Sequence, residues 1–235
     1  NQVIAYKEKN FKLTYQKNGS QLKALLKKEA KVFFGSNVYF MNVIVSPVLS
    51  VIATIAVYFS VSKEIDNSII DLKTIFPLIL PCLHIFIMGM TTSSSSSISM
   101  EGKQFWILKT SPVNTRNVLL AKSLFNVLLY VPFIIANFVI ALILYKFTFI
   151  SAFIMLLIEI IAVSTLSLLG LWVNLINYKL DWDNPSQVIK SGANTFIAML
   201  CGFIIDFIVI ISTVVCFLLD VFIPFPVLLM VIGLF

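Results

Sequence analysis

Long stretches without charge constrain this chain more than any other feature of its sequence. Residues 43–61 contain no charged side chain, and residues 195–219 contain one, Asp206. A helix needs about 20 mostly apolar residues to cross a bilayer, so both stretches are long enough to span one. Backbone groups in lipid must be paired within the protein, and neither stretch alternates polar with apolar residues as a barrel strand does. The sequence therefore predicts an all-α, polytopic transmembrane helix bundle.

Five complete spans and a truncated sixth are predicted. The complete spans cover residues 43–61, 75–98, 123–145, 149–173 and 195–219, and the sixth begins near residue 221. This divides the chain into a cytoplasmic segment, residues 1–42, and a transmembrane domain, residues 43–235. Because the sequence starts without Met and stops inside an apolar stretch, we expect a fragment of a longer protein.

Lysine and arginine are distributed unevenly between the two sides of these spans. An N-terminus in the cytoplasm places 14 of the 17 Lys and Arg residues on the cytoplasmic side. Cytoplasmic loops of membrane proteins carry such an excess, so the bias predicts a cytoplasmic N-terminus. The same bias accounts for the net charge of +6. We therefore expect the lipid bilayer, and not nucleic acid, to be the partner of these basic residues. The abundance of Ile, Lys, Phe and Asn points to a low-GC bacterium, and hence to a bacterial plasma membrane.

Residues 22–34 are predicted to form an amphipathic helix in the membrane interface. At about 100° per residue, the apolar side chains gather on one side of this helix and four lysines on the other. Glu29 falls on the apolar side, where a carboxylate is unexpected. Two interpretations stay open: Glu29 lies near the lipid headgroups, or it pairs with a partner surface.

The motif content speaks against an enzyme. The chain has one histidine and no GxxxxGK[ST] loop, so it cannot form a two-histidine metal site or bind ATP by that loop. We expect no catalytic residues, no metal and no cofactor in this chain. Three ionisable side chains fall at membrane depth, His84, Glu159 and Asp206. Charges there are costly, which makes these residues functional candidates. A protonated carboxyl bonded between helices, or one that faces a wet cavity, is the structural alternative.

The loop at residues 101–122, EGKQFWILKTSPVNTRNVLLAK, mixes aromatic with basic side chains and follows the hydroxyl-rich run TTSSSSS at residues 91–97. From physics alone, this loop either lies at the membrane interface or docks into another protein. Its sequence resembles the loop between spans two and three in the membrane subunit of type-2 ABC exporters. LKKE at residues 26–29 resembles the connecting helix of that family. GLWVN at residues 170–174 and LDWDNP at residues 180–185 resemble a second cytoplasmic loop of a Gram-positive subgroup.

This resemblance implies a permease that forms a translocation path and couples to a separate ABC ATP-binding subunit, on which ATP would bind. It also implies a second permease half or a homodimer partner, with this chain as the C-terminal half of a longer permease. The coupling residues that it implies are Glu29, Glu101, Gly102, Lys103, Trp106, Lys109, Pro112 and Arg116. The alternative from a different class is a proton-coupled secondary carrier that uses Glu159 or Asp206.

Overall fold

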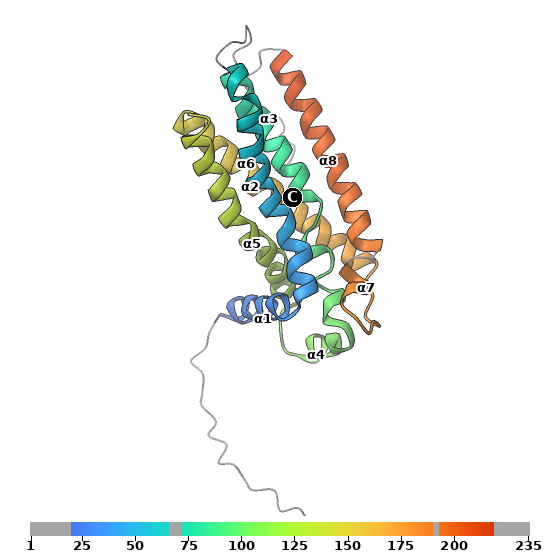
Figure 1. The fold of residues 1–235 in the computed structure, drawn as a ribbon. Coiled ribbons are helices and arrows are strands. Elements are labelled where there is room, and N and C mark those ends of the chain that lie inside the picture. Colours follow the sequence, from blue (N-terminus) through green and yellow to red (C-terminus); the bar gives the residue numbers. More distant parts are fainter. Residues whose placement is uncertain (1–19, 66–71, 190–192, 219–235) are drawn as a thin grey trace, which may run out of the picture.

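The computed structural model describes residues 20–65, 72–189 and 193–218, and this part of the chain is helical. Five long helices run side by side as a bundle (Figure 1). They are α2 (Asn37–Ile65), α3 (Leu72–Gly89), α5 (Thr115–Ile143), α6 (Phe149–Ile176) and α8 (Ala193–Leu218). Helix α1 (Gln21–Gly35) lies across one end, where the short helices α4 (Phe105–Thr110) and α7 (Ser186–Ile189) are also found. We call this the α1 end of the bundle.

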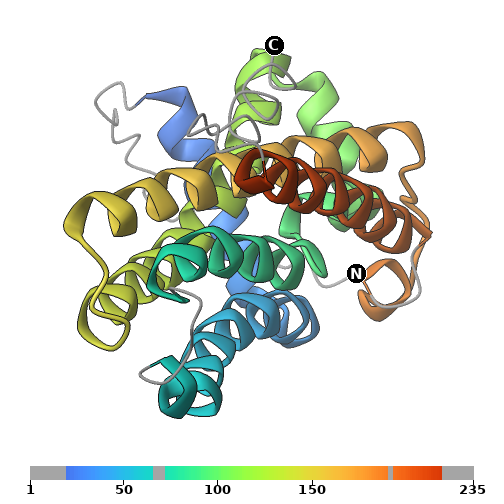
Figure 2. The ribbon, with the colours of Figure 1, turned by 90° about the horizontal axis from the view of Figure 1, so that it is seen from above.

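Helix α6 packs against three of the other long helices. These are α3, α5 and α8, and Figure 2 shows the bundle from above. Ala152 and Ala162 are fully buried on α6. Small side chains of this kind allow close approach between helices in a membrane protein, where packing and not water exclusion drives association.

Four stretches of the described chain are long and apolar enough to cross a membrane: Asn37–Val61, Thr115–Ile143, Phe149–Ile176 and Ser186–Ile208. They overlap the first, third, fourth and fifth predicted spans. The predicted total of five complete spans and a truncated sixth is therefore not confirmed. The sixth span, from residue 221, lies outside the described residues.

The second predicted span is wrong in its last nine residues, 90–98. Helix α3 ends at Gly89, and the chain continues through turns and two 3-10 helices, η1 (Ser93–Ser95) and η2 (Ser99–Gln104). In a continuous helix over residues 75–98, these hydroxyl groups could bond to carbonyls four residues earlier. Instead, Ser95 and Ser97 donate to carbonyls only three residues earlier, at 2.8 and 3.1 Å. Serine side chains that bond to nearby main-chain groups in this way compete with the hydrogen bonds of a helix. We call residues 91–99 the serine segment.

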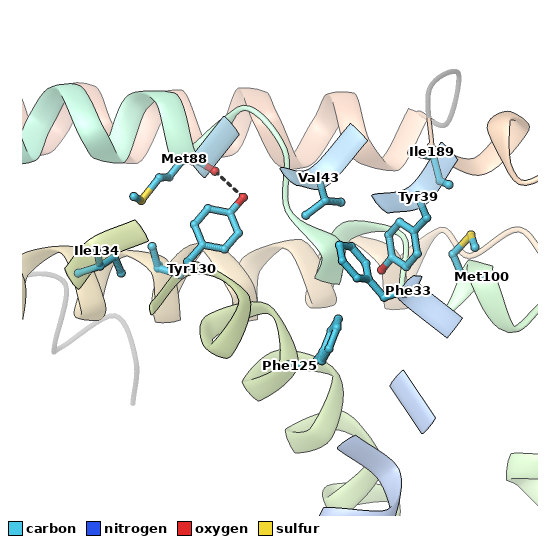
Figure 3. Packing of buried hydrophobic residues seen from close by; sticks show 10 residues of the cluster. Phe33, Tyr39, Val43, Met88, Met100, Phe125, Tyr130, Ile134 and Ile189 are labelled. Carbon is cyan, nitrogen blue, oxygen red and sulfur yellow. Dashed lines mark hydrogen bonds between the residues drawn. The ribbon is translucent and has the colours of Figure 1, made fainter. Parts of the chain in front are cut away.

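The predicted amphipathic helix is present as α1. Its buried face carries Leu25, Glu29 and Phe33, as the helical periodicity predicted. Phe33 is fully buried, with its ring centroid 5.1 Å from that of Tyr39 on α2 and 5.4 Å from that of Phe125 on α5. Figure 3 shows this aromatic cluster. It fixes α1 to two of the long helices, and thereby places Glu29 against the bundle.

Candidate functional site

A buried lysine joins three elements at the α1 end of the bundle. Lys122 on α5 is 1% exposed, and its Nζ lies 2.9 Å from Glu29 Oε1 on α1 and 2.7 Å from Glu101 Oε1 on η2. Its third hydrogen bond reaches the main-chain oxygen of Ser97 at 2.9 Å. An ammonium group has three protons to donate, so Lys122 is fully paired. Lys28 also donates to Glu101, and two positive charges balance two negative ones in this Lys122 cluster.

The two carboxylates of the Lys122 cluster differ in their electrostatics. Burial raises the pKa of Glu29 above the ordinary 4.5, and the Lys122 ammonium offsets this only in part. Burial acts on Glu101 too, but Lys122 and Lys28 together outweigh it and hold the Glu101 pKa below 4.5. Glu101 is therefore the firmly ionised member, whereas Glu29 takes up a proton more readily. Neither interpretation of Glu29 is confirmed, because the carboxylate is buried against the bundle and pairs with Lys122 of the same chain.

Side-chain amides from two spans hold the serine segment in place. Asn126 Oδ1 on α5 accepts hydrogen bonds from both the N–H and the Oγ of Ser93, each at 2.8 Å. Asn174 Oδ1 on α6 accepts from two consecutive main-chain N–H groups, those of Ile98 and Ser99, at 2.8 and 3.2 Å. Non-helical backbone at membrane depth is tolerated only where the protein buries and pairs it. These asparagines meet that requirement.

Gly102 occupies a position that only glycine fits well. Its φ is +53°, and a Cβ at this position would lie 3.0 Å from the ring of Trp182. The indole N–H of Trp182 donates to the main-chain oxygen of Ser99 at 2.8 Å, so the ring is held against η2. A side chain at residue 102 would be strained in this backbone conformation and would push the ring away. Gly102 thus fixes the path of the chain from the serine segment into α4.

The predicted coupling residues divide into two groups. Glu29, Glu101 and Gly102 face inward and hold α1 and η2 to the bundle. Trp106, on α4, is 63% exposed. The other outward-facing residues are Lys103, Lys109, Pro112 and Arg116.

A second group of polar side chains lies between four of the long helices. The Nδ1 of His84 on α3 is 2.6 Å from Glu159 Oε1 on α6, and its Nε2 is 2.7 Å from Thr54 Oγ1 on α2. Thr54 in turn donates to Asn137 Oδ1 on α5 at 3.0 Å. All four side chains are fully buried, and we call them the His84 network. Two of the three residues predicted at membrane depth are therefore in contact.

Asp206, the third of these residues, is buried on α8. Its Oδ1 has no hydrogen-bond partner within residues 20–65, 72–189 and 193–218. The hydrogen bonds described for these residues do not join Asp206 to His84 or Glu159.

Several residues of these groups were not predicted as site residues, although Lys122 and Asn174 fall within the motifs at residues 101–122 and 170–174. They are Thr54, Lys122, Asn126, Asn137 and Asn174. Lys122 and Asn126 carried a usable signal, because they lie four residues apart, on one face of a helix, at the start of an apolar stretch. Their partners are distant in sequence, and no local pattern identifies them.

The described part of the chain contains no group of three or more His, Cys, Asp or Glu side chains that could hold a metal ion. No curated protein and no solved structure was found to match the chain. A protein family does match it, over residues 2–235, and this family is described as "Membrane protein of 12 TMs". The bundle of long apolar helices agrees with that description. The chain belongs to this family of twelve-span membrane proteins.

Proposed function

We propose that this chain is the permease component of an ATP-driven exporter of the type-2 ABC class, coupled at its α1 end to a separate ATP-binding subunit. The resemblance of residues 101–122 and 26–29 supports this function, as does the membership of a multi-span family. The distribution of Lys and Arg favours a cytoplasmic α1 end, where ATP is available. The sequence lacks the phosphate-binding loop, so ATP hydrolysis is assigned to the partner.

The proposal rests on the 101–122 loop, which is anchored to a membrane helix at one point and exposes apolar side chains at another. At its start, Glu101 is bound to Lys122 on the long helix α5. Five residues later, Trp106 stands 63% exposed on α4, beside Ile107 at 46%. Exposed aromatic residues are typical anchors of protein interfaces. A subunit that binds α4 would therefore act on an element tied by a buried ion pair to a membrane helix.

The same ion pair extends this coupling to α1. Because Lys122 also binds Glu29, a displacement of η2 relative to α5 would break or strain contacts on both sides of the lysine. Packed contacts of this kind switch between discrete arrangements and do not deform gradually. The Lys122 cluster is thus suited to pass a movement at α4 into the bundle as a whole.

The test is to purify the full-length protein together with the ABC ATP-binding subunits of its source cell and to measure ATP hydrolysis in liposomes. We expect the ATPase to bind and its activity to depend on the permease. Trp106→Ala should weaken binding by about 2 kcal/mol, the loss that defines an interface anchor. Phe149→Ala is the matched control, because Phe149 is 65% exposed at the opposite end of the bundle. The proposal fails if no ATPase binds, or if both variants bind and stimulate it like the wild type.

A proton-coupled secondary carrier is the second candidate, and the His84 network favours it. Buried carboxylates and histidines between membrane helices are typical of proton relays. In this case a proton gradient would drive transport without ATP, and Glu159→Gln would abolish it. Transport that needs ATP and tolerates Glu159→Gln would exclude the carrier.

A further inference from the structure

We propose that Glu159 and His84 form a buried proton-binding site, in which Glu159 is a neutral acid that donates to the Nδ1 of a neutral imidazole. The ligand is one proton, held on Oε1 of Glu159. The inference rests on the directions of the hydrogen bonds in the His84 network. It holds whether the chain works with an ATPase or as a carrier.

Two hydroxyl side chains of α2, Ser50 and Thr54, determine the directions of these hydrogen bonds. Ser50 Oγ lies 2.7 Å from the main-chain oxygen of Pro47, which can only accept, so the single hydroxyl proton of Ser50 points there. Ser50 Oγ then accepts from Asn137 Nδ2 at 3.3 Å, which turns the Oδ1 of that amide toward Thr54. The Thr54 hydroxyl has two acceptors within reach, Asn137 Oδ1 at 3.0 Å and the main-chain oxygen of Ser50 at 2.8 Å. Its one proton lies toward these two oxygens, because a proton turned to His84 Nε2 would leave both of them facing Oγ1 with no proton between.

His84 must therefore donate to Thr54. With the Thr54 proton directed elsewhere, a hydrogen bond of 2.7 Å between Nε2 and Oγ1 requires a proton on Nε2. The other ring nitrogen, Nδ1, faces Glu159 Oε1 at 2.6 Å, and a proton must lie between these two atoms as well. The pair thus holds two protons and has no net charge.

The second oxygen of Glu159 decides which group owns the shared proton. Oε2 is buried and has no hydrogen-bond partner among the described residues. A carboxylate would spread its charge over both oxygens, and an unpaired charged oxygen in an apolar interior is very costly. A carboxylic acid leaves Oε2 as a neutral carbonyl oxygen, for which the missing partner costs far less. The proton therefore belongs on Oε1.

Other titratable groups do not compete for the imidazole. Those described are Cys82 on α3, Tyr39 and Tyr58 on α2, Arg116, Lys122 and Tyr130 on α5, Tyr145 just beyond the end of α5, Glu159 on α6, and Cys201 and Asp206 on α8. Among them, Glu159 alone is hydrogen-bonded to His84 in the described part of the chain. Both side chains are fully buried, so the proton leaves only when α3 and α6 separate and admit water. The O–H bond of Glu159 then breaks, the proton passes to water, and a hydrated carboxylate remains.

The test is nitrogen NMR of the full chain in lipid bilayers with ¹⁵N in the histidine ring. The sequence contains a single histidine, so the spectrum reports His84 alone. We expect a protonated Nε2 and an unprotonated, strongly hydrogen-bonded Nδ1. Glu159→Gln should keep this tautomer, because an amide also donates to Nδ1, but should shift the Nδ1 signal. Asp206→Asn, the matched buried acid, should leave the spectrum unchanged.

Two results would overturn the proposal, and the wild-type spectrum alone can give either of them. A protonated Nδ1 with a bare Nε2 would reverse the hydrogen-bond chain and make Glu159 anionic. An imidazolium, protonated on both nitrogens, would place the shared proton on the ring.

Discussion

Replacing Lys122 with methionine removes a group on α5 that binds α1 and η2 at the same time. Methionine is flexible and of similar length, so the effect is mainly electrostatic and not that of a cavity. Breaking a buried ion pair by removing one partner costs about 3–5 kcal/mol, because the other charge stays buried and uncompensated. Lys28 still contacts Glu101 and lies 4.0 Å from Glu29, which relieves part of that cost. We therefore expect a loss at the low end, about 3 kcal/mol, or roughly a hundredfold in the unfolding equilibrium.

The loss should also depend on pH. Glu29 already has a pKa raised by burial above 4.5, and without the Lys122 ammonium it is raised further. A raised carboxyl pKa contributes stability that is complete below the unfolded value and is lost as the pH rises through the folded value. The free energy of unfolding of the Lys122→Met variant therefore rises relative to that of the wild type as the pH falls toward 4.5. The difference in unfolding free energy should be largest near neutral pH and should narrow in acid.

Unfolding of the protein in detergent micelles, followed by tryptophan fluorescence at neutral and acidic pH, measures both effects. Lys109→Met is the matched control, because Lys109 lies exposed on α4 and makes no ion pair in the described structure. The double variant Lys122→Met/Glu29→Gln should recover part of the loss, since it removes the uncompensated carboxylate. The reasoning is refuted if Lys122→Met is as stable as Lys109→Met, or if its loss is the same at both pH values.

Three further substitutions test other parts of the α1 end. Gly102→Ala should cost about 1–3 kcal/mol through its positive φ and its contact with an indole ring, while Gly35→Ala, with no atom within 4 Å of the added Cβ, should match the wild type in thermal unfolding. Asn174→Leu leaves two buried N–H groups unpaired and should cost about 2 kcal/mol or more in stability. The control Asn177→Leu replaces an exposed residue and should cost nothing comparable; equal melting temperatures of the two variants would contradict the role of the buried amide. Glu101→Gln should lose stability most above pH 4.5 and approach the wild type in stronger acid, because a lowered carboxyl pKa contributes stability that is lost as the pH falls through the folded value; a pH-independent difference would contradict this.

The helical membrane fold could be predicted because its signals are local. Charge-free stretches such as residues 43–61 mark membrane helices wherever they occur, and the stripe on residues 22–34 identified the buried face of α1, including Glu29. The error in residues 75–98 has a different origin. Whether a run of hydroxyl residues stays helical depends on the acceptors around it, and those are supplied by asparagines on α5 and α6.

The candidate site could be predicted only in part, for the same reason. His84 and Glu159 stood out individually as ionisable residues in apolar stretches, but they are 75 positions apart and no spacing rule joins them. Lys122 is separated from Glu29 by 93 positions, and its burial depends on how α1 folds back across α5. A sequence pattern gives the face of each helix and leaves open which faces meet.

The proposed coupling role of α4 is tested most directly by a photo-crosslinking amino acid placed at position 106 in the full-length protein in its native membrane. We predict an adduct with an ATP-binding subunit, identified by mass spectrometry, whose yield changes when a non-hydrolysable ATP analogue is added. The same probe at position 149, at the opposite end of the bundle, should give no such adduct. Adducts with lipid alone at position 106 would contradict the account, because α4 would then lie in the membrane interface and have no partner to receive.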